Sequence, residues 1–172
     1  MLNWLKTKIK KNGFTLVEAL VSMMMVSIAF LGIYSAVSKY AQQTKQIKDT
    51  YIASLLGQEG IEIVRNIRDK NWVTGAAWDA GLTSCSGCNG HSNGCQADYN
   101  DASLSAYNDT TGYLWINNDS FYDYGGTGTM TSYKRQICID ETGGKLLHLV
   151  VNIYWAGGRQ TTIKEDLYNW KW

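Results

Sequence analysis

The most regular pattern in the chain is an apolar segment that continues directly into an amphipathic one. Residues 14–34 have roughly the length needed to span a membrane, and Glu18 is their only charged residue. Further along, apolar side chains recur at spacings of four or eight residues, as they do on one face of a helix. The residues of this stripe are Ile47, Tyr51, Ile52, Leu55, Leu56, Ile63, Val64 and Ile67. We therefore predict one helix from about residue 15 to about residue 69.

The amphipathic half of this predicted helix contains two glycines, Gly57 and Gly60. Glycine costs about 1 kcal/mol relative to alanine in a helix interior. We expect both residues to weaken the helix locally.

Beyond Trp72 the pattern changes to strands separated by turns. Residues 79–132 are rich in residues that favour turns, and only 113–117 resembles a strand there. Three longer strand candidates follow, at 133–140, 146–155 and 160–169. Glycines at 143–144 and 157–158 separate them, as in hairpin turns. The predicted fold class is α+β, with a long N-terminal helix packed by its amphipathic half on a C-terminal antiparallel sheet.

Positive charge is concentrated ahead of the apolar segment. Residues 1–13 hold four lysines and no acidic residue. Basic residues before an apolar run place the N-terminus in the cytoplasm and direct the rest of the chain outward. An ordinary signal peptide is the alternative, with residues 36–38 as its cleavage site. Because the run is long for a signal peptide and the helical pattern continues past it, we expect the segment to be retained.

The rest of the chain is mildly acidic. Residues 72–172 contain six Lys and Arg against ten Asp and Glu. This balance does not support a broad basic surface, so we expect no nucleic-acid partner. No pattern of nucleophile and base or of paired carboxylates indicates an active site, and His148 stands alone in its predicted strand. We expect no enzymatic activity and no cofactor.

A short motif lies where the basic residues meet the apolar segment. It reads Gly13-Phe14-Thr15-Leu16-Val17-Glu18. With lysines before it and an apolar run after it, this motif resembles the prepilin cleavage motif of the type IV pilin and pseudopilin superfamily. Residues 56–72, and more loosely the last forty, also resemble minor pilins of the PilV kind. Major pilins of the family often carry a proline near residues 32–36, and this chain has none.

The resemblance implies that the chain is a substrate of processing and not a catalyst. A prepilin peptidase would cut after Gly13 and methylate the new amino group of Phe14. Glu18 matches the family's buried carboxylate, which pairs with the terminal amine of a neighbouring subunit. The implied partners are this peptidase, other pilin subunits in a helical filament, an inner-membrane assembly platform and the membrane. The protein would span the inner membrane once, with its N-terminus in the cytoplasm, before it joins an extracellular filament.

The residue types in this motif suit these roles on physical grounds. Gly13 has no side chain and leaves the backbone open to a peptidase. Glu18 lies four residues from Phe14, or about 6 Å along a helix. A carboxylate at mid-bilayer costs about 2.5–3.5 kcal/mol on insertion scales. An ion pair with a newly made ammonium offsets that cost in a low dielectric; the alternative is a Glu that reaches the lipid headgroups.

Four cysteines, all beyond residue 84, indicate disulfides formed in an oxidising compartment. Cys85, Cys88, His91 and Cys95 lie within eleven residues, so a zinc site is the alternative. Three disulfide pairings are open. We predict that Cys138 pairs with Cys95 and that Cys85 pairs with Cys88.

Two residue classes in the loops have alternative interpretations. Aspartates in Asn- and Gly-rich loops are potential calcium ligands, but no regular spacing emerges, and we interpret them as solvated turns. They are Asp98, Asp101, Asp109, Asp119 and Asp123. Residues 72–172 also hold six Trp and eight Tyr, which we expect mainly in the core. A glycan-binding surface on loops 79–132 is the alternative.

These observations divide the chain into a leader (1–13), an N-terminal helix (14–71) and a β-rich head (72–172). Residues 14–35 would form the transmembrane segment and the filament core, and 79–132 an irregular loop region in the head. We expect a minor pilin, a structural subunit of a type IV pilus-like filament. The alternatives are a type II secretion pseudopilin, a pilus-tip adhesin or glycan-binding module, and a membrane-anchored zinc protein.

Overall fold

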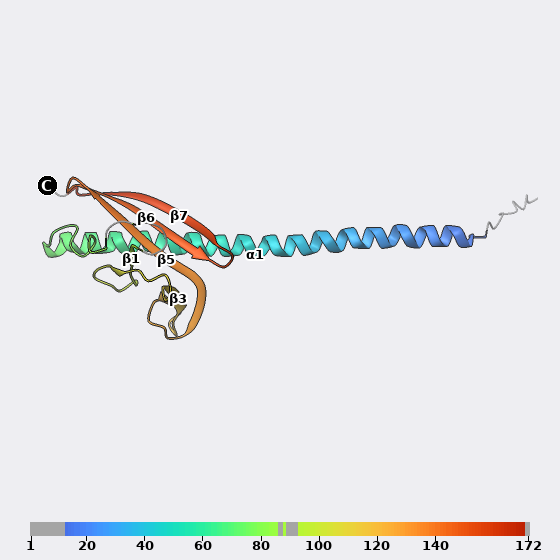
Figure 1. Cartoon of the computed structure of the whole chain (residues 1–172), viewed down its shortest axis with the longest axis horizontal. Coiled ribbons are helices and arrows are strands. Elements are labelled where there is room, and N and C mark those ends of the chain that lie inside the picture. Colours follow the sequence, from blue (N-terminus) through green and yellow to red (C-terminus); the bar gives the residue numbers. More distant parts are fainter. Residues whose placement is uncertain (1–12, 86–87, 89–92, 171–172) are drawn as a thin grey trace, which may run out of the picture. The chain divides into compact units, whose positions relative to one another are not determined.

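The computed structural model describes residues 13–85, 88 and 93–170 (Figure 1). In this part of the chain one helix precedes a set of strands. The elements are α1 (Leu16–Thr74), β1 (Cys95–Gln96), β2 (Ser105–Ala106), β3 (Tyr113–Ile116), β4 (Tyr122–Asp123), β5 (Thr129–Thr142), β6 (Leu146–Trp155) and β7 (Arg159–Tyr168). All strand pairs are antiparallel. The predicted α+β fold class is confirmed.

The helix α1 extends to Thr74, beyond the predicted end at about residue 69. Two backbone hydrogen bonds close this end. Gly75 N–H donates to the carbonyl of Trp72 at 3.4 Å, and Ala76 N–H to that of Asn71 at 2.9 Å. The pattern is a Schellman motif, in which Gly75 adopts a φ of +76° that only glycine reaches without strain. Gly75 is therefore the sequence signal that marks the boundary.

The predicted three-stranded sheet is confirmed and belongs to a larger one. β6 pairs with β5 and β7, while β5 also pairs with β1 and β3. β5 begins at Thr129, before the predicted start at 133, because its first residues pair with β3. The strands β1, β2 and β4 were not predicted, since two residues are too few to show alternation.

One face of the sheet packs on the second half of α1. Every second residue of β6 is buried, namely Leu147, Leu149, Val151, Ile153 and Trp155. The buried residues of α1 are Ala53, Leu56, Gly57, Gly60, Ile61, Ile63, Val64, Ile67, Arg68 and Trp72. The predicted apolar stripe was wrong at its start, since Ile47, Tyr51 and Leu55 are 71%, 64% and 45% exposed. The face of α1 that contacts the sheet includes Gly57 and Gly60, which the predicted apolar stripe did not contain.

Gly57 and Gly60 have a packing role that the sequence analysis missed. A Cβ on Gly60 would lie 3.0 Å from both Arg135 Cδ and Val151 Cγ1. A Cβ on Gly57 would lie 2.7 Å from Ile163 Cδ1. The helix backbone thus comes close to the sheet at both positions. At Gly60 the neighbours of an added Cβ are buried, whereas at Gly57 the nearest atom is the movable end of the Ile163 side chain.

Arg135 is a fully buried cation between the helix and the sheet. Its guanidinium donates to the carbonyls of Leu56 at 3.4 Å and Ala97 at 2.9 Å. It also forms an ion pair with Glu59 at 3.4 Å. Tyr124 O–H donates to the Arg135 carbonyl at 3.0 Å, and burial raises the pKa of Tyr124 to about 12. Because a buried charge is stable only with such partners, Arg135 ties β5 to α1 and to the loop after β1.

We predict that Gly60→Ala destabilises the fold even though alanine favours helix. Alanine contributes about 1 kcal/mol of helix propensity, but overpacking a core costs about 1–3 kcal/mol. The groups beside Gly60 are buried and stiff, so we expect the free energy of unfolding to fall by about 1–2 kcal/mol. Chemical denaturation of the full chain in micelles, followed by tryptophan fluorescence, measures this change.

Gly57→Ala is the matched control for that experiment. The atom it would meet is the terminal carbon of the half-buried Ile163 side chain, which can rotate away. We expect little net change in stability. If Gly60→Ala stabilises the protein as much as helix propensity alone predicts, the close contact at Gly60 is wrong.

Two disulfides attach the irregular region to the sheet. Cys85 pairs with Cys95, and Cys88 pairs with Cys138, with Cα–Cα distances of 5.6 and 5.5 Å. All four predicted cysteines are thus bonded, but the predicted pairing of Cys95 with Cys138 and of Cys85 with Cys88 was wrong. Cys95 in β1 lies opposite Ile137, so it is a neighbour of Cys138 along β5 and not its partner. Successive strand residues point to opposite faces, which separates these two thiols.

The pairing predicts which thiol is released when one cysteine is removed. In Cys95→Ser, alkylation of the denatured, non-reduced protein should modify Cys85, because Cys88 and Cys138 remain bonded. Mass spectrometry of the labelled peptides locates the modification. Labelling of Cys138 instead would contradict the observed pairing and favour the one predicted from the sequence.

Candidate processing and assembly site

The motif at the start of α1 forms a capped helix terminus. Gly13 and Phe14 lie outside the helix and are exposed. The Glu18 N–H donates to Thr15 Oγ1 at 3.2 Å, and the Ala19 N–H donates to the Thr15 carbonyl at 3.1 Å. Thr15 is therefore the N-cap residue, and Glu18 is the third residue of the helix. Thr-x-x-Glu is the spacing of a capping box, a signal that the sequence analysis did not use.

Glu18 carries the only acidic group in the first turn of α1. Its side chain is exposed, and no residue in the described part of the chain pairs with its carboxylate. The first turn of a helix has a positive electrostatic potential, which favours an anion there. Helical Cα–Cβ bonds tilt toward the N-terminus, so the Glu18 side chain leaves the helix in the direction of its first turn.

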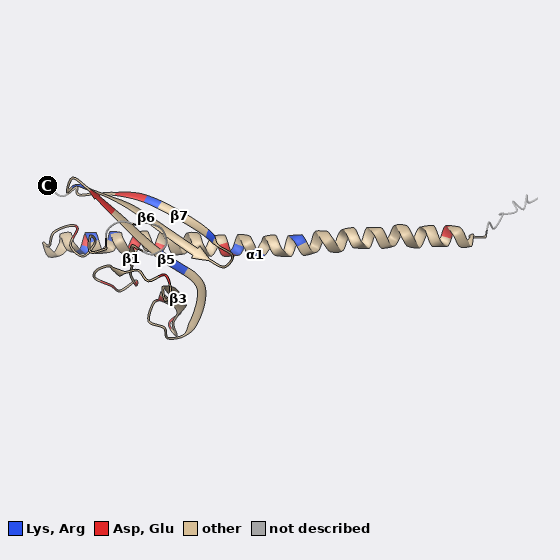
Figure 2. Ribbon diagram, in the orientation of Figure 1, with Lys and Arg blue, Asp and Glu red and all other residues tan. Residues whose placement is uncertain are grey.

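The helix surface that follows Glu18 is apolar on all sides. Every large apolar side chain from Phe14 to Tyr40 is exposed. Figure 2 shows how few charged residues this half of α1 carries. Among the described residues, α1 is the helix that is long and apolar enough to cross a membrane. A surface of this kind needs lipid or other apolar helices around it.

A comparison with protein families indicates the function of this helix terminus. Residues 8–34 match the family model of the prokaryotic N-terminal methylation motif. This match supports membership of the type IV pilin and pseudopilin superfamily. Neither a curated protein nor a solved structure matches it. The matched segment contains the cap, the carboxylate and the apolar helix surface described above.

The motif indicates several properties of this pilin-like protein. It supports processing by a prepilin peptidase. The implied partners are this peptidase and other pilin subunits. It indicates a structural subunit and not an enzyme. Together with the apolar half of α1, it fits a single-pass membrane pilin.

The structure does not support the zinc alternative. Cys85, Cys88 and Cys95 are all in disulfides, and a disulfide sulfur lacks the thiolate charge that zinc requires. His91 lies outside the described residues. Within the described ranges, no group of His, Cys, Asp and Glu is arranged to hold a metal ion.

The loop aspartates accept hydrogen bonds in turns. Asp98 Oδ1 accepts from the Tyr124 N–H at 3.0 Å, and Asp123 Oδ1 accepts from the Gly125 N–H at 3.1 Å. Burial, and then the nearby carboxylate of Asp101, raise the pKa of Asp98 above its usual value. These contacts agree with the interpretation of the aspartates as turn residues.

His148, singled out in the sequence analysis, and one aromatic pair in the loops have partners that only the structure reveals. His148 is not alone, since its Nδ1 lies 2.8 Å from Asp166 Oδ1 on the adjacent strand β7. In the loops, the exposed rings of Tyr99 and Phe121 stack with their centroids 4.7 Å apart. In the described part of residues 72–172, Trp72, Trp78, Trp155 and Tyr133 belong to the core, and Tyr122 and Tyr124 pack against it.

Proposed function

We propose that this pilin-like protein is a minor subunit of an extracellular type IV pilus-like filament. The observation that carries the proposal is the apolar half of α1, which begins directly after an exposed, non-helical Gly13–Phe14 bond. A soluble protein does not keep such a surface exposed to water. Lipid covers it before assembly, and the helices of neighbouring subunits cover it in the filament.

In this proposal residues 1–13 are a leader that the peptidase removes. A peptidase needs access to the backbone at the bond it cuts, and Gly13 and Phe14 are exposed and lie outside the helix. Hydrolysis after Gly13 frees the α-amino group of Phe14, which is methylated as the neutral amine and carries a positive charge when it is protonated. The cap is unaffected by the cut, because Thr15 and Glu18 both lie on the retained side. The mature chain therefore starts with a preformed helix.

Glu18 is the residue that sets the position of a subunit in the filament. The new ammonium group lies at the positive end of α1, where it is unfavourable unless an anion compensates it. The carboxylate of a neighbouring subunit provides that anion, in surroundings where a charge pair is strong and an unpaired charge is costly. Only a neighbour displaced by the correct axial step brings the two groups together.

The remaining parts of the chain have corresponding roles. Residues 14–35 form the transmembrane segment and later the filament core, and residues 72–172 form the head that the filament displays. An inner-membrane assembly platform transfers the subunit from the bilayer into the filament. A type II secretion pseudopilin has the same N-terminal chemistry; recovery of this chain in filaments sheared from the cell surface favours the pilus.

We predict that Glu18→Gln prevents incorporation into filaments and leaves membrane insertion intact. The substitution removes the charge but keeps the size of the side chain and the capping hydrogen bond that Thr15 Oγ1 accepts from the backbone N–H of residue 18. The amount of the variant in the sheared filament fraction, relative to the membrane fraction, should fall at least tenfold. Immunoblotting of the two fractions measures this ratio.

Glu62→Gln is the matched control, because Glu62 is an exposed carboxylate of the same helix that pairs with Arg65 inside the chain. This variant should enter filaments like the parent. Equal incorporation of Glu18→Gln and the parent chain would refute the assembly role of Glu18.

A further inference from the structure

Four side chains form a row across the sheet on the face that points away from α1. Tyr113, Lys134, Tyr154 and Gln160 belong to β3, β5, β6 and β7 and lie opposite one another in register. The residues of β6 on either side of Tyr154 are buried toward α1, so the alternation of the strand places this row on the other face. No family motif covers this part of the chain.

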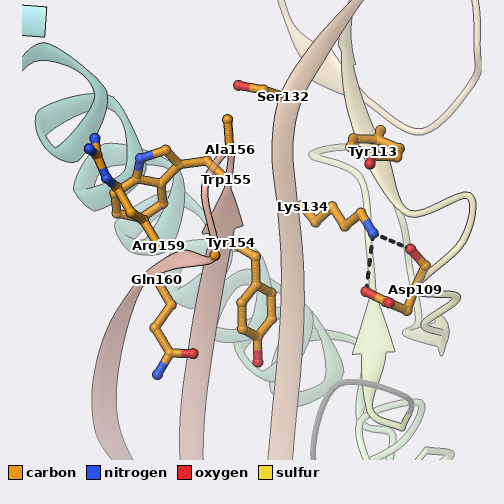
Figure 3. A pocket seen from close by; sticks show the side chains of 10 residues that line it. Asp109, Tyr113, Ser132, Lys134, Tyr154, Trp155, Ala156, Arg159 and Gln160 are labelled. Atoms are coloured by element: carbon orange, nitrogen blue, oxygen red, sulfur yellow. Dashed lines mark hydrogen bonds and ion pairs between the residues drawn. The ribbon is translucent and has the colours of Figure 1, made fainter. Parts of the chain in front are cut away.

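The row borders a cavity of about 390 Å³, which Asp109 and Ser132 also line. Figure 3 shows Lys134 reaching from β5 toward Asp109 and Tyr113, with Tyr154 and Gln160 on the neighbouring strands. The Lys134 ammonium lies 4.6 Å from the centroid of the Tyr113 ring. Aromatic rings and hydrogen-bonding groups therefore meet in one concave site, as in small-molecule sites of about 300–1,000 Å³.

The charges at this cavity compensate one another. Lys134 Nζ donates to the backbone carbonyl of Asp109 and to Asp109 Oδ1, the latter at 3.2 Å. Tyr107 O–H donates to the same carboxylate oxygen at 3.0 Å. Arg159 also lines the cavity. It lies opposite Trp155 in register, and Figure 3 shows its side chain beside the Trp155 ring, away from Lys134 and Asp109. The row from Tyr113 to Gln160 thus meets oriented donors and acceptors whose charges compensate one another, and Arg159 adds one cation beside Trp155.

This composition selects among ligand classes. An anion at the row requires a cation that is not already compensated; Lys134 is paired there, and Arg159 lies beside Trp155, away from the row. A metal ion or an organic cation requires free carboxylates, and Asp109 already accepts from Lys134 and Tyr107. A purely apolar ligand would leave the Gln160 amide and the Ser132 hydroxyl without partners, which is costly. A neutral ligand with many hydroxyl groups and an apolar face satisfies all of these groups.

We propose that this cavity binds a neutral pyranose sugar of a glycan. A pyranose ring has a face of C–H groups, which packs on an aromatic ring, and a rim of hydroxyls. The Tyr113 and Tyr154 rings supply the aromatic surfaces. The Gln160 amide and the Ser132 hydroxyl each offer a donor and an acceptor for the hydroxyls. The ion pair between Lys134 and Asp109 fixes the position of a further donor and acceptor.

Saturation-transfer NMR on the full chain tests this proposal. The protein is held in dodecylphosphocholine micelles, because sugar-based detergents would occupy the site. The probes are the methyl pyranosides of glucose, galactose, mannose and N-acetylglucosamine, with methyl glucuronide as an acidic comparison. At least one neutral pyranoside should receive saturation, most strongly at its ring C–H protons. Neither filament assembly nor N-terminal processing is needed for this readout, so it is independent of the proposed function.

Variants locate the binding within the protein. Gln160→Ala and Tyr113→Ala should each weaken binding at least fivefold. Lys164→Ala is the matched control, because Lys164 is exposed on the same face of β7 and lies outside the cavity. The affinity of this variant for the pyranoside should remain within twofold of that of the parent. The Gln160 side chain is exposed and forms no hydrogen bond in the described part of the chain. Its substitution should therefore leave the fold and the melting temperature unchanged.

Three results would overturn the proposal. One is the absence of saturation transfer to every neutral pyranoside. Another is transfer that Gln160→Ala and Tyr113→Ala leave unchanged, since the sugar would then bind elsewhere. The third is a response restricted to methyl glucuronide, which would assign the cavity to anions.

Discussion

The apolar first half of α1 is the constraint on which the other features of this protein depend. Its large apolar side chains are exposed from Phe14 to Tyr40. Each Å² of apolar surface in contact with water costs about 25 cal/mol of free energy. Lipid tails and the apolar sides of similar helices are nearly equivalent surroundings for such a surface. In the proposed function, one sequence therefore serves both in the membrane and in a filament. What would distinguish the two is charge, which Glu18 would supply at the end where the proposed processing creates an amine.

The head is held by a different interaction, the close contact of α1 with the sheet. Gly57 and Gly60 remove the side chains that would separate the two layers, and Arg135 fills the space beside Gly60. Because Arg135 is buried, its partners on α1 and after β1 are fixed with it. The bridge between Cys88 and Cys138 attaches the irregular region to the same strand. Cys138 lies on the same face of β5 as Lys134, so the bridge holds the irregular region over one part of the outer face, and the cavity lies further along the strand, beside Lys134.

The helix and the long strands of this fold are predictable from the sequence. Contacts between residues that are far apart in the sequence are not. Alternation and glycine turns place β6 correctly and β7 to within one residue. The start of α1 follows from the motif, and Gly75 signals its end. By contrast, the packing role of Gly60 depends on which residues of the sheet lie above it. The disulfide pairing depends on which face of a strand each thiol occupies. The row from Tyr113 to Gln160 unites four strands, so no spacing along the chain reveals it.

The central claim is that the apolar segment is retained and begins at a newly made amine. Mass spectrometry of the N-terminal peptide of the mature protein, purified from cell envelopes, tests it most directly. The result expected is a chain that begins with N-methylated Phe14 and keeps the whole of α1. An N-terminus still at Met1, or one near Ser38 with the apolar segment removed, would contradict it.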